Sequence, residues 1–194
     1  MNSEPSTPQN PPGAPASGAA LILDAAAIER CLRRLAHEII ERNSDLTKVV
    51  LAGIPSRGVH IAERLAGLIE QFENVRVFAG AVDVSMHRDD LHARRRLVPV
   101  QPTRLPHELK EQTVVLVDDV LFSGRTCRAA MDALSSFGRP ARVQLAALVD
   151  RGHRELPIRA DYVGKNLPTS LEQRVFVRFQ AVDGVADGVW MSRP

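Results

Sequence analysis

Apolar residues along the chain recur first at a helical spacing and then as a short continuous run, and this change of period repeats. From Asp24 to about Asn43 an apolar stripe that includes Ile28 and Leu35 follows the helical period, with Asp24 suited to the N-cap position. The apolar run that follows, 48–54, has the length and composition of a buried strand. The chain therefore starts with a helix and a strand.

The same alternation continues towards the C-terminus. Strands that alternate with helices form βαβ units, so we expect an α/β fold with a mostly parallel central sheet flanked by helices. The sequence predicts further helices over about 58–72 and 124–137, and further strands over 75–84, 113–117, 143–149, near Tyr162, over 175–179 and over 189–191.

Two segments lack a sustained hydrophobic period. Residues 1–19 are rich in Pro, Ser, Gly and Ala, so we expect a disordered tail followed by one domain over 20–194. Residues 86–112 are charged and interrupted by proline. A loop of this length inside a domain is usually functional or mobile, so we expect a mobile loop at about 86–112.

Composition excludes several classes of protein. The sequence is 44% hydrophobic and 25% charged, which is ordinary for a globular protein. The formal net charge is only +2, so nucleic-acid binding could come only from local clusters of basic residues. Cys31 and Cys127 form no CxxC pair, and no run of 18 apolar residues occurs. We therefore expect a reduced, cytoplasmic protein with no membrane partner. No pair of the six histidines lies at metal-ligand spacing with a carboxylate or cysteine, so we expect no structural metal.

The strongest chemical signal is the segment 114–126, Val-Val-Leu-Val-Asp-Asp-Val-Leu-Phe-Ser-Gly-Arg-Thr. An apolar strand delivers Asp118 and Asp119 to its carboxyl end, where ligands bind in open α/β sheets. A turn with Ser123, Gly124 and Thr126 then opens a helix, whose N–H groups can bind an anion. A phosphate site next to two acceptors for vicinal hydroxyls predicts a ribose 5-phosphate. The alternative is that the acids only end a strand and cap a helix.

This segment resembles the phosphoribosyl pyrophosphate (PRPP) motif of type I phosphoribosyltransferases. The segments 34–38, 53–58, 88–91, 149–161 and 163–170 narrow the resemblance to the PyrR family, over about Leu21 to the C-terminus. That family comprises regulators of pyrimidine-biosynthesis operons that also act as uracil phosphoribosyltransferases. The resemblance implies a type I phosphoribosyltransferase fold with a small hood.

The resemblance also implies roles for individual residues. Asp118 and Asp119 would hold the ribose hydroxyls, and Arg57 would join them in catalysis. Mg²⁺ would enter with PRPP, and no structural metal is implied. Nucleobase contacts would come from Arg151, Val163 and Lys165. The residues implied to bind PRPP or nucleotide are Ser56, Arg57, Arg88, Asp118, Asp119, Val120, Leu121, Phe122, Ser123, Gly124, Arg125 and Thr126.

Basic residues gather at two places. Arg30, Arg33, Arg34 and His37 share one face of the first helix, and a second cluster lies around 151–165. Neither cluster need bind nucleic acid. The first can be a solvated helix face, and the second can be a charged turn beside an active site. The resemblance implies that a homodimer or higher homo-oligomer binds the mRNA of pyrimidine operons in response to uridine nucleotides (UMP, UTP). The implied RNA contacts are Arg34, His37, His153, Arg154, Arg159 and Lys165.

Some positions depart from the family pattern. Phe122 and His87 stand where the family usually has tyrosine, and Arg33 where it often has threonine. Two alternatives therefore stay open beside the bifunctional protein. One is a phosphoribosyltransferase for another base, such as a purine, although Tyr162 is the only aromatic residue near the expected base site before Phe176. The other is an RNA-binding regulator that senses nucleotides with little or no catalytic turnover.

Overall fold

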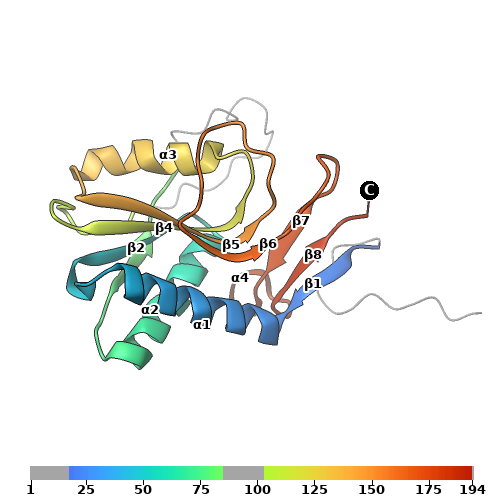
Figure 1. Cartoon of the computed structure of the whole chain (residues 1–194), viewed down its shortest axis with the longest axis horizontal. Helices are drawn as coiled ribbons and strands as arrows, with labels where there is room; N and C mark the ends of the chain where they lie inside the picture. Colours follow the sequence, from blue (N-terminus) through green and yellow to red (C-terminus); the bar gives the residue numbers. More distant parts are fainter. Residues whose placement is uncertain (1–17, 85–102, 194) are drawn as a thin grey trace, which may run out of the picture.

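A five-stranded parallel sheet forms the centre of the protein in this computed structural model, which describes residues 18–84 and 103–193 (Figure 1). The strand order is β3-β2-β4-β5-β6, and every neighbouring pair is parallel. The predicted fold class is confirmed. The strands are β2 (Val49–Gly53), β3 (Phe78–Ala81), β4 (Thr113–Leu121), β5 (Arg142–Asp150) and β6 (Tyr162–Asn166).

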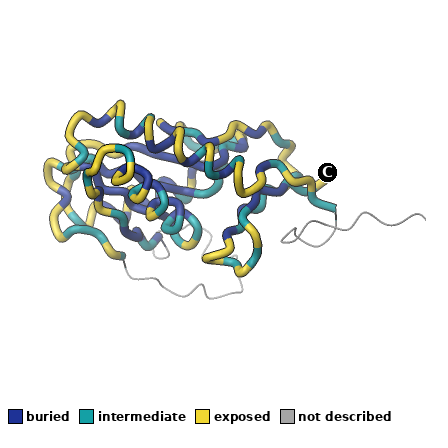
Figure 2. The backbone as a smooth tube through the Cα atoms, turned by 90° about the horizontal axis from the view of Figure 1, so that it is seen from below, coloured by how far each residue is buried: buried dark blue, intermediate teal, exposed yellow. Residues whose placement is uncertain are grey.

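Helices cover both faces of this sheet. α1 (Ala25–Arg42) and α2 (Arg57–Glu73) lie on one face, and α3 (Arg125–Leu134) lies on the other (Figure 1). The sheet therefore separates two apolar cores. Successive strand residues point to opposite faces, so Val115 of β4 packs with α1 and α2, whereas Val114 packs with α3. Figure 2 shows the strands buried between helices whose outer residues are exposed.

A second, three-stranded antiparallel sheet corresponds to the hood that the resemblance implied. β1 (Ala20–Asp24), β8 (Gly188–Met191) and β7 (Val175–Arg178) lie in the order β1-β8-β7. The short helix α4 (Gln180–Asp183) lies between β7 and β8 in the chain. The start of the domain thus pairs with its end, because Leu21 lies opposite Trp190.

Most predicted elements are present with small shifts of their ends. The helix predicted to reach 137 ends as α3 at Leu134 and continues as the 3-10 turn η3 (Ser135–Phe137). The strand predicted over 75–84 shortens to β3. A second 3-10 turn, η1 (Leu46–Lys48), precedes β2. No helix within the described residues has both the length and the apolar character needed to cross a bilayer.

The predicted loop 86–112 lies only partly within the described residues. Its last part is held by backbone hydrogen bonds, from Arg104 N to Ala81 O at 2.8 Å and from Leu109 N to Phe137 O at 3.2 Å. Leu109 is fully buried in the core on the α3 side. The tail predicted over 1–19 also lies almost wholly outside the described residues.

Candidate functional site

Two acidic residues occupy the carboxyl end of β4. The apolar pattern predicted a strand end at Val117, but β4 continues to Leu121 because it keeps pairing with β5, from Asp118 opposite Ala147 to Leu121 opposite Asp150. Asp118 is buried, with 7% of its surface exposed, whereas Asp119 is partly exposed. Backbone N–H groups contact both carboxylates, from Asp119 to Asp118 Oδ1 at 2.9 Å and from Val120 to Asp119 Oδ1 at 3.0 Å.

The two carboxylates act on different neighbours. Burial, followed by the negative charge of Asp118, raises the pKa of the Cys127 thiol on α3 to about 11. Burial raises the pKa of Asp119, and the positive charge of Arg57 opposes that rise. Successive side chains of a strand point to opposite faces of the sheet, so Asp118 and Asp119 have different neighbours. The side chain of Asp118 therefore lies on the α3 side of the sheet, and that of Asp119 lies on the side where α2 begins.

A tight turn, Phe122 to Gly124, links β4 to α3, and we call it the phosphate loop. Gly124 has a φ of +91°, a left-handed conformation that suits glycine. A Cβ atom at Gly124 would also lie 3.3 Å from the side chain of Ile158. The carbonyl of Ser123 accepts hydrogen bonds from the N–H groups of Glu155 and Leu156, at 3.0 and 3.2 Å. Because the first N–H groups of α3 have no acceptor within the helix, this turn can bind an anion.

Arg154 fixes the phosphate loop from outside. Its guanidinium donates to the carbonyl of Phe122 at 2.7 Å and to that of Ile158 at 2.9 Å. It also forms an ion pair with Asp150, and only 22% of the Arg154 side chain is exposed. Arg154 was predicted to contact RNA, and that role stays a prediction. In this structure its guanidinium holds the loop in shape.

Ser56 ends the loop between β2 and α2, and Arg57 is the first residue of α2. Arg57 donates to both carboxylate oxygens of Asp183 in α4, at 3.1 and 2.5 Å. Burial opposes the ionisation of Asp183, but the hydrogen bond from Arg57, a backbone N–H and nearby arginines outweigh it and lower its pKa. Asp183 thus joins the site through Arg57. The sequence analysis missed it, because no local pattern distinguishes an acid in so short a helix.

The predicted base-contacting residues lie around Phe122. Arg151 is buried, and its guanidinium lies 4.4 Å from the centre of the Phe122 ring. It also donates to Thr169 Oγ1 at 3.2 Å and to the carbonyl of Ser170 at 2.8 Å. Burial lowers the pKa of Arg151. In β6, the predicted contact Val163 is partly buried, whereas Lys165 is exposed.

Arg34 brings the two predicted basic clusters together. It lies on α1 and donates to the carbonyls of Val163 and Gly164 in β6, at 3.1 and 2.5 Å. Gly164 itself packs against the backbone of Leu148, so a side chain there would collide with it. His37, Arg159 and Lys165 are exposed, and His153 is partly buried with its Nε2 2.6 Å from the carbonyl of Thr169. The clusters therefore adjoin across α1 and β6.

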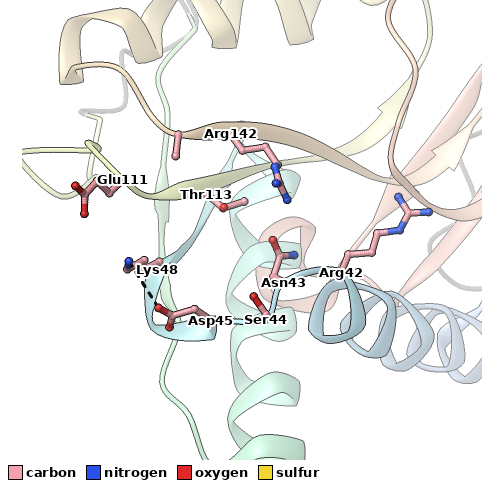
Figure 3. Close-up of a pocket in the computed structure, with 9 residues that line it drawn as sticks. Arg42, Asn43, Ser44, Asp45, Lys48, Glu111, Thr113 and Arg142 are labelled. Atoms are coloured by element: carbon pink, nitrogen blue, oxygen red, sulfur yellow. Dashed lines mark ion pairs between the residues drawn. The ribbon is translucent and has the colours of Figure 1, made fainter.

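A hollow lies at the other end of the strands from the acidic pair (Figure 3). Lys48, Thr113 and Arg142 line it, and they immediately precede or begin β2, β4 and β5. It is therefore at the amino ends of the strands, away from the acidic pair. Lys48 and Asp45 form a long ion pair at 3.9 Å inside it. The other lining residues are Arg42, Asn43, Ser44, Glu111 and Ala141.

Some of the predicted residues lie outside the described chain. Arg88 is one, as are His87 and the acids Asp89 and Asp90 that follow. Within 18–84 and 103–193, no group of three or more His, Cys, Asp or Glu residues is arranged to hold a metal ion.

Comparison with known proteins places the chain in a family. A phosphoribosyl transferase domain model matches residues 19–180. The bifunctional protein PyrR of Chloroflexus aurantiacus is 58% identical over 168 residues, 87% of this chain and 92% of that protein. Those of Roseiflexus sp. and Geobacter sulfurreducens are 55% and 52% identical, over 89% and 87% of this chain and 94% and 96% of theirs.

Solved structures share the fold at low sequence identity. The hypoxanthine phosphoribosyltransferase of Trypanosoma cruzi has a TM-score of 0.69 at 19% identity, covering 93% of this chain and 95% of that one. The enzyme of Leishmania tarentolae bound to GMP has a TM-score of 0.68 at 16% identity, covering 93% and 100%. These likenesses concern the fold alone. The family follows from the domain match over residues 19–180 and from the relatives at 52–58% identity: the chain belongs to the PyrR family of phosphoribosyltransferases.

Proposed function

We propose that this protein transfers the phosphoribosyl group of PRPP to uracil, giving UMP and pyrophosphate, and that it regulates pyrimidine-biosynthesis genes by binding their mRNA in response to uridine nucleotides. The observation that carries the proposal is the end of β4, where Asp118 and Asp119 adjoin the phosphate loop and the start of α3. This arrangement offers acceptors for two ribose hydroxyls beside N–H donors for a phosphate.

Different groups of residues bind different parts of the substrate. The N–H groups of the phosphate loop and the first turn of α3 bind the 5-phosphate, and Asp118 and Asp119 accept from the ribose hydroxyls. Ser56 and Arg57 bind the pyrophosphate, and Arg88 belongs to the same site. Arg151, Val163 and Lys165 surround the base. The support for the described residues is positional. Asp118 and Asp119 lie in the last part of β4, and Ser56 and Arg57 follow β2. Arg151 follows β5, and Val163 and Lys165 lie in β6.

In the reaction, the bond between C1 of the ribose and the pyrophosphate oxygen breaks. A bond from C1 to a ring nitrogen of uracil forms, and that nitrogen loses its proton. Negative charge grows on the departing pyrophosphate, and a preorganised cation beside it lowers the barrier. Arg57 is such a cation, because Asp183 and the start of α2 hold its guanidinium in one place.

Mg²⁺ entering with PRPP fits the residues at this site. Mg²⁺ prefers oxygen ligands, usually one or two carboxylates together with substrate phosphates. Asp118 and Asp119 supply two carboxylates near the carboxyl end of β4, where the substrate phosphates would bind. When bound, the ion would neutralise charge on the pyrophosphate.

The base is identified by an assay of pyrophosphate release. The protein is incubated with Mg²⁺, PRPP and either uracil, hypoxanthine or guanine, and we expect release with uracil alone. Release with a purine but not with uracil would overturn the proposal for this base. Binding of UMP without release under any condition would instead favour the nucleotide-sensing regulator, an alternative consistent with Phe122, which has no hydroxyl and lies under Arg151.

The regulatory part involves the basic residues of α1, the turn after β5 and β6. We propose that a cytoplasmic homodimer presents them to the RNA. Phosphate contacts dominate such binding and make it depend on salt. Arg34→Ala should therefore weaken binding to a pyrimidine-operon leader RNA and reduce the salt slope by about one. An unchanged affinity and slope in a titration at two salt concentrations would remove Arg34 from the RNA surface.

A further inference from the structure

A pair of stacked rings lies on the outside of α1 and α2. The rings of His37 and Phe72 are nearly parallel, with centres 4.2 Å apart and an angle of 7° between them. The guanidinium of Arg33 lies 4.8 Å from the centre of the same Phe72 ring. Both helices belong to the face of the sheet opposite α3, where they run side by side (Figure 1).

The stack leaves one ring face open. His37 is exposed, whereas Phe72 is only partly so. Because Phe72 covers one face of the imidazole, the exposure of His37 comes from the other face and the edge. Packing against Phe72 fixes the plane of the imidazole, so the open face is held in one orientation before any partner binds. A preorganised flat surface loses less entropy on binding than a freely rotating side chain does.

The surroundings of this open face are basic. Arg30, Arg33 and Arg34 lie on the same side of α1, and Arg30 and Arg33 are exposed like His37. Proteins that read RNA by sequence use this combination: unpaired bases stack on aromatic or histidine rings while arginines contact the phosphates. A plain packing role for Phe72 would require neither a ring stacked flat on it nor an exposed ring outside it.

We propose that His37, held flat against Phe72, is a platform on which one unpaired base of the RNA stacks. The inference rests on the RNA-binding function proposed above and adds the class of contact, a stacked base rather than a phosphate. Phe72 is then a positioning residue, because it acts through the imidazole of His37.

The test uses three variants of the full-length protein and an RNA hairpin from the leader of a pyrimidine-biosynthesis operon. Phe72→Leu keeps an apolar side chain between the helices but removes the flat ring, and Phe72→Tyr restores the ring. Phe78→Leu is the matched control, because Phe78 is another phenylalanine at the surface, 45% exposed, but lies in the edge strand β3. Thermal unfolding of each variant shows whether it is folded.

We expect Phe72→Leu to bind the hairpin about tenfold more weakly, at the lower end of the effect of losing one stacked base. Its salt slope should equal that of the wild type, since no phosphate contact is lost. Phe72→Tyr and Phe78→Leu should bind like the wild type. Equal affinity of Phe72→Leu and the wild type would overturn the inference, as would a changed salt slope.

A second measurement separates stacking from a general disturbance of the helices. Each unpaired base of the hairpin is replaced in turn by an abasic nucleotide. One replacement should weaken binding to the wild type about tenfold and have no further effect on Phe72→Leu, which is the pattern of two changes that remove the same contact. Independent losses at every position would refute the platform. A wild type that does not bind the hairpin at all would instead refute the RNA-binding function itself.

Discussion

Arg154 connects the phosphate loop to the turn that follows β5. Its guanidinium donates to the carbonyls of Phe122 and Ile158 and to the carboxylate of Asp150, all within 2.9 Å, and to the carbonyl of Gly152 at 3.2 Å. Hydrogen bonds from a charged group to partly buried acceptors contribute more to stability than neutral ones. One side chain therefore stabilises the phosphate loop, beside the backbone hydrogen bonds that Ser123 accepts.

Arg154→Ala should raise the KM for PRPP by about tenfold or more, because Phe122 and its neighbours lose the group that orders them. It should also lower the free energy of unfolding by roughly 2 kcal/mol, since Asp150 loses its partner. Steady-state kinetics and urea unfolding measure the two effects. Arg159→Ala, an exposed arginine of the same turn, serves as the comparison and should affect RNA affinity alone. An unaltered KM in Arg154→Ala would show that the loop keeps its shape without the clamp.

Glycine residues decide how closely α2 approaches the sheet. A side chain at Gly58, the second residue of α2, would collide with the carbonyl oxygen of Val117, just before the acidic pair. Gly67 is in the same helix, is exposed and would have no atom within 4 Å of an added Cβ. Tertiary packing therefore requires glycine at position 58 but not at position 67.

Substituting alanine at these two positions should change stability in opposite directions. Gly58→Ala should destabilise the protein by about 2–3 kcal/mol, because the helix must move away from β4. Gly67→Ala should stabilise it by roughly 0.5–1 kcal/mol, since alanine loses less backbone entropy in a helix. Urea unfolding of both variants measures the difference, and a loss of stability in Gly67→Ala would contradict this account.

The sequence predicted the helices and strands well wherever the apolar period is strong, as in α1, which begins and ends where Asp24 and Asn43 indicated. It placed the end of β4 at Val117, because the two acids interrupt the apolar run. Pairing with β5 carries the strand on to Leu121. Backbone hydrogen bonding to a neighbour does not depend on the polarity of the side chain, so this extension leaves no trace in the apolar pattern.

At the scale of the whole molecule, ion pairs join the hood to α2, the helix that packs on the main sheet. Asp183 of α4 holds Arg57 at the start of α2, and Asp187 holds Arg64 further along that helix at 2.7 Å. The first pair reaches Arg57, the arginine that we propose to act on the pyrophosphate, and the second does not. The hood therefore contributes to the site from the far end of the chain.

Asp183→Asn should raise the KM for PRPP by about tenfold with a much smaller change in the KM for uracil, because Arg57 is then no longer held in place. Asp187→Asn breaks the comparable pair with Arg64 and should leave the KM for PRPP unchanged. Steady-state kinetics with both substrates distinguish the two variants. Equal effects of the two substitutions would mean that the hood acts only through stability.

The same pair predicts a dependence of stability on pH. The pKa of Asp183 is lowered in the folded protein, so its stabilising effect is present above the ordinary aspartate range and is lost as the pH falls through it, below about 4. The difference in unfolding free energy between the wild type and Asp183→Asn should therefore be constant near neutral pH and shrink in acid. Urea unfolding at several pH values measures it, and a difference that grows in acid would contradict the assignment.

The sequence alone determined the α/β class, the order of most elements and the position of Asp118, Asp119 and the phosphate loop at a strand end. These features depend on residues close together in the chain, whose apolar period and turn chemistry can be read locally. The tertiary structure decided the pairing of Arg57 with Asp183, the clamp of Arg154, the link from Arg34 to β6 and the stack of His37 on Phe72. Each of these contacts joins side chains or carbonyls that come together only when separate elements pack, and the spacing of residues along the chain contains no record of that approach.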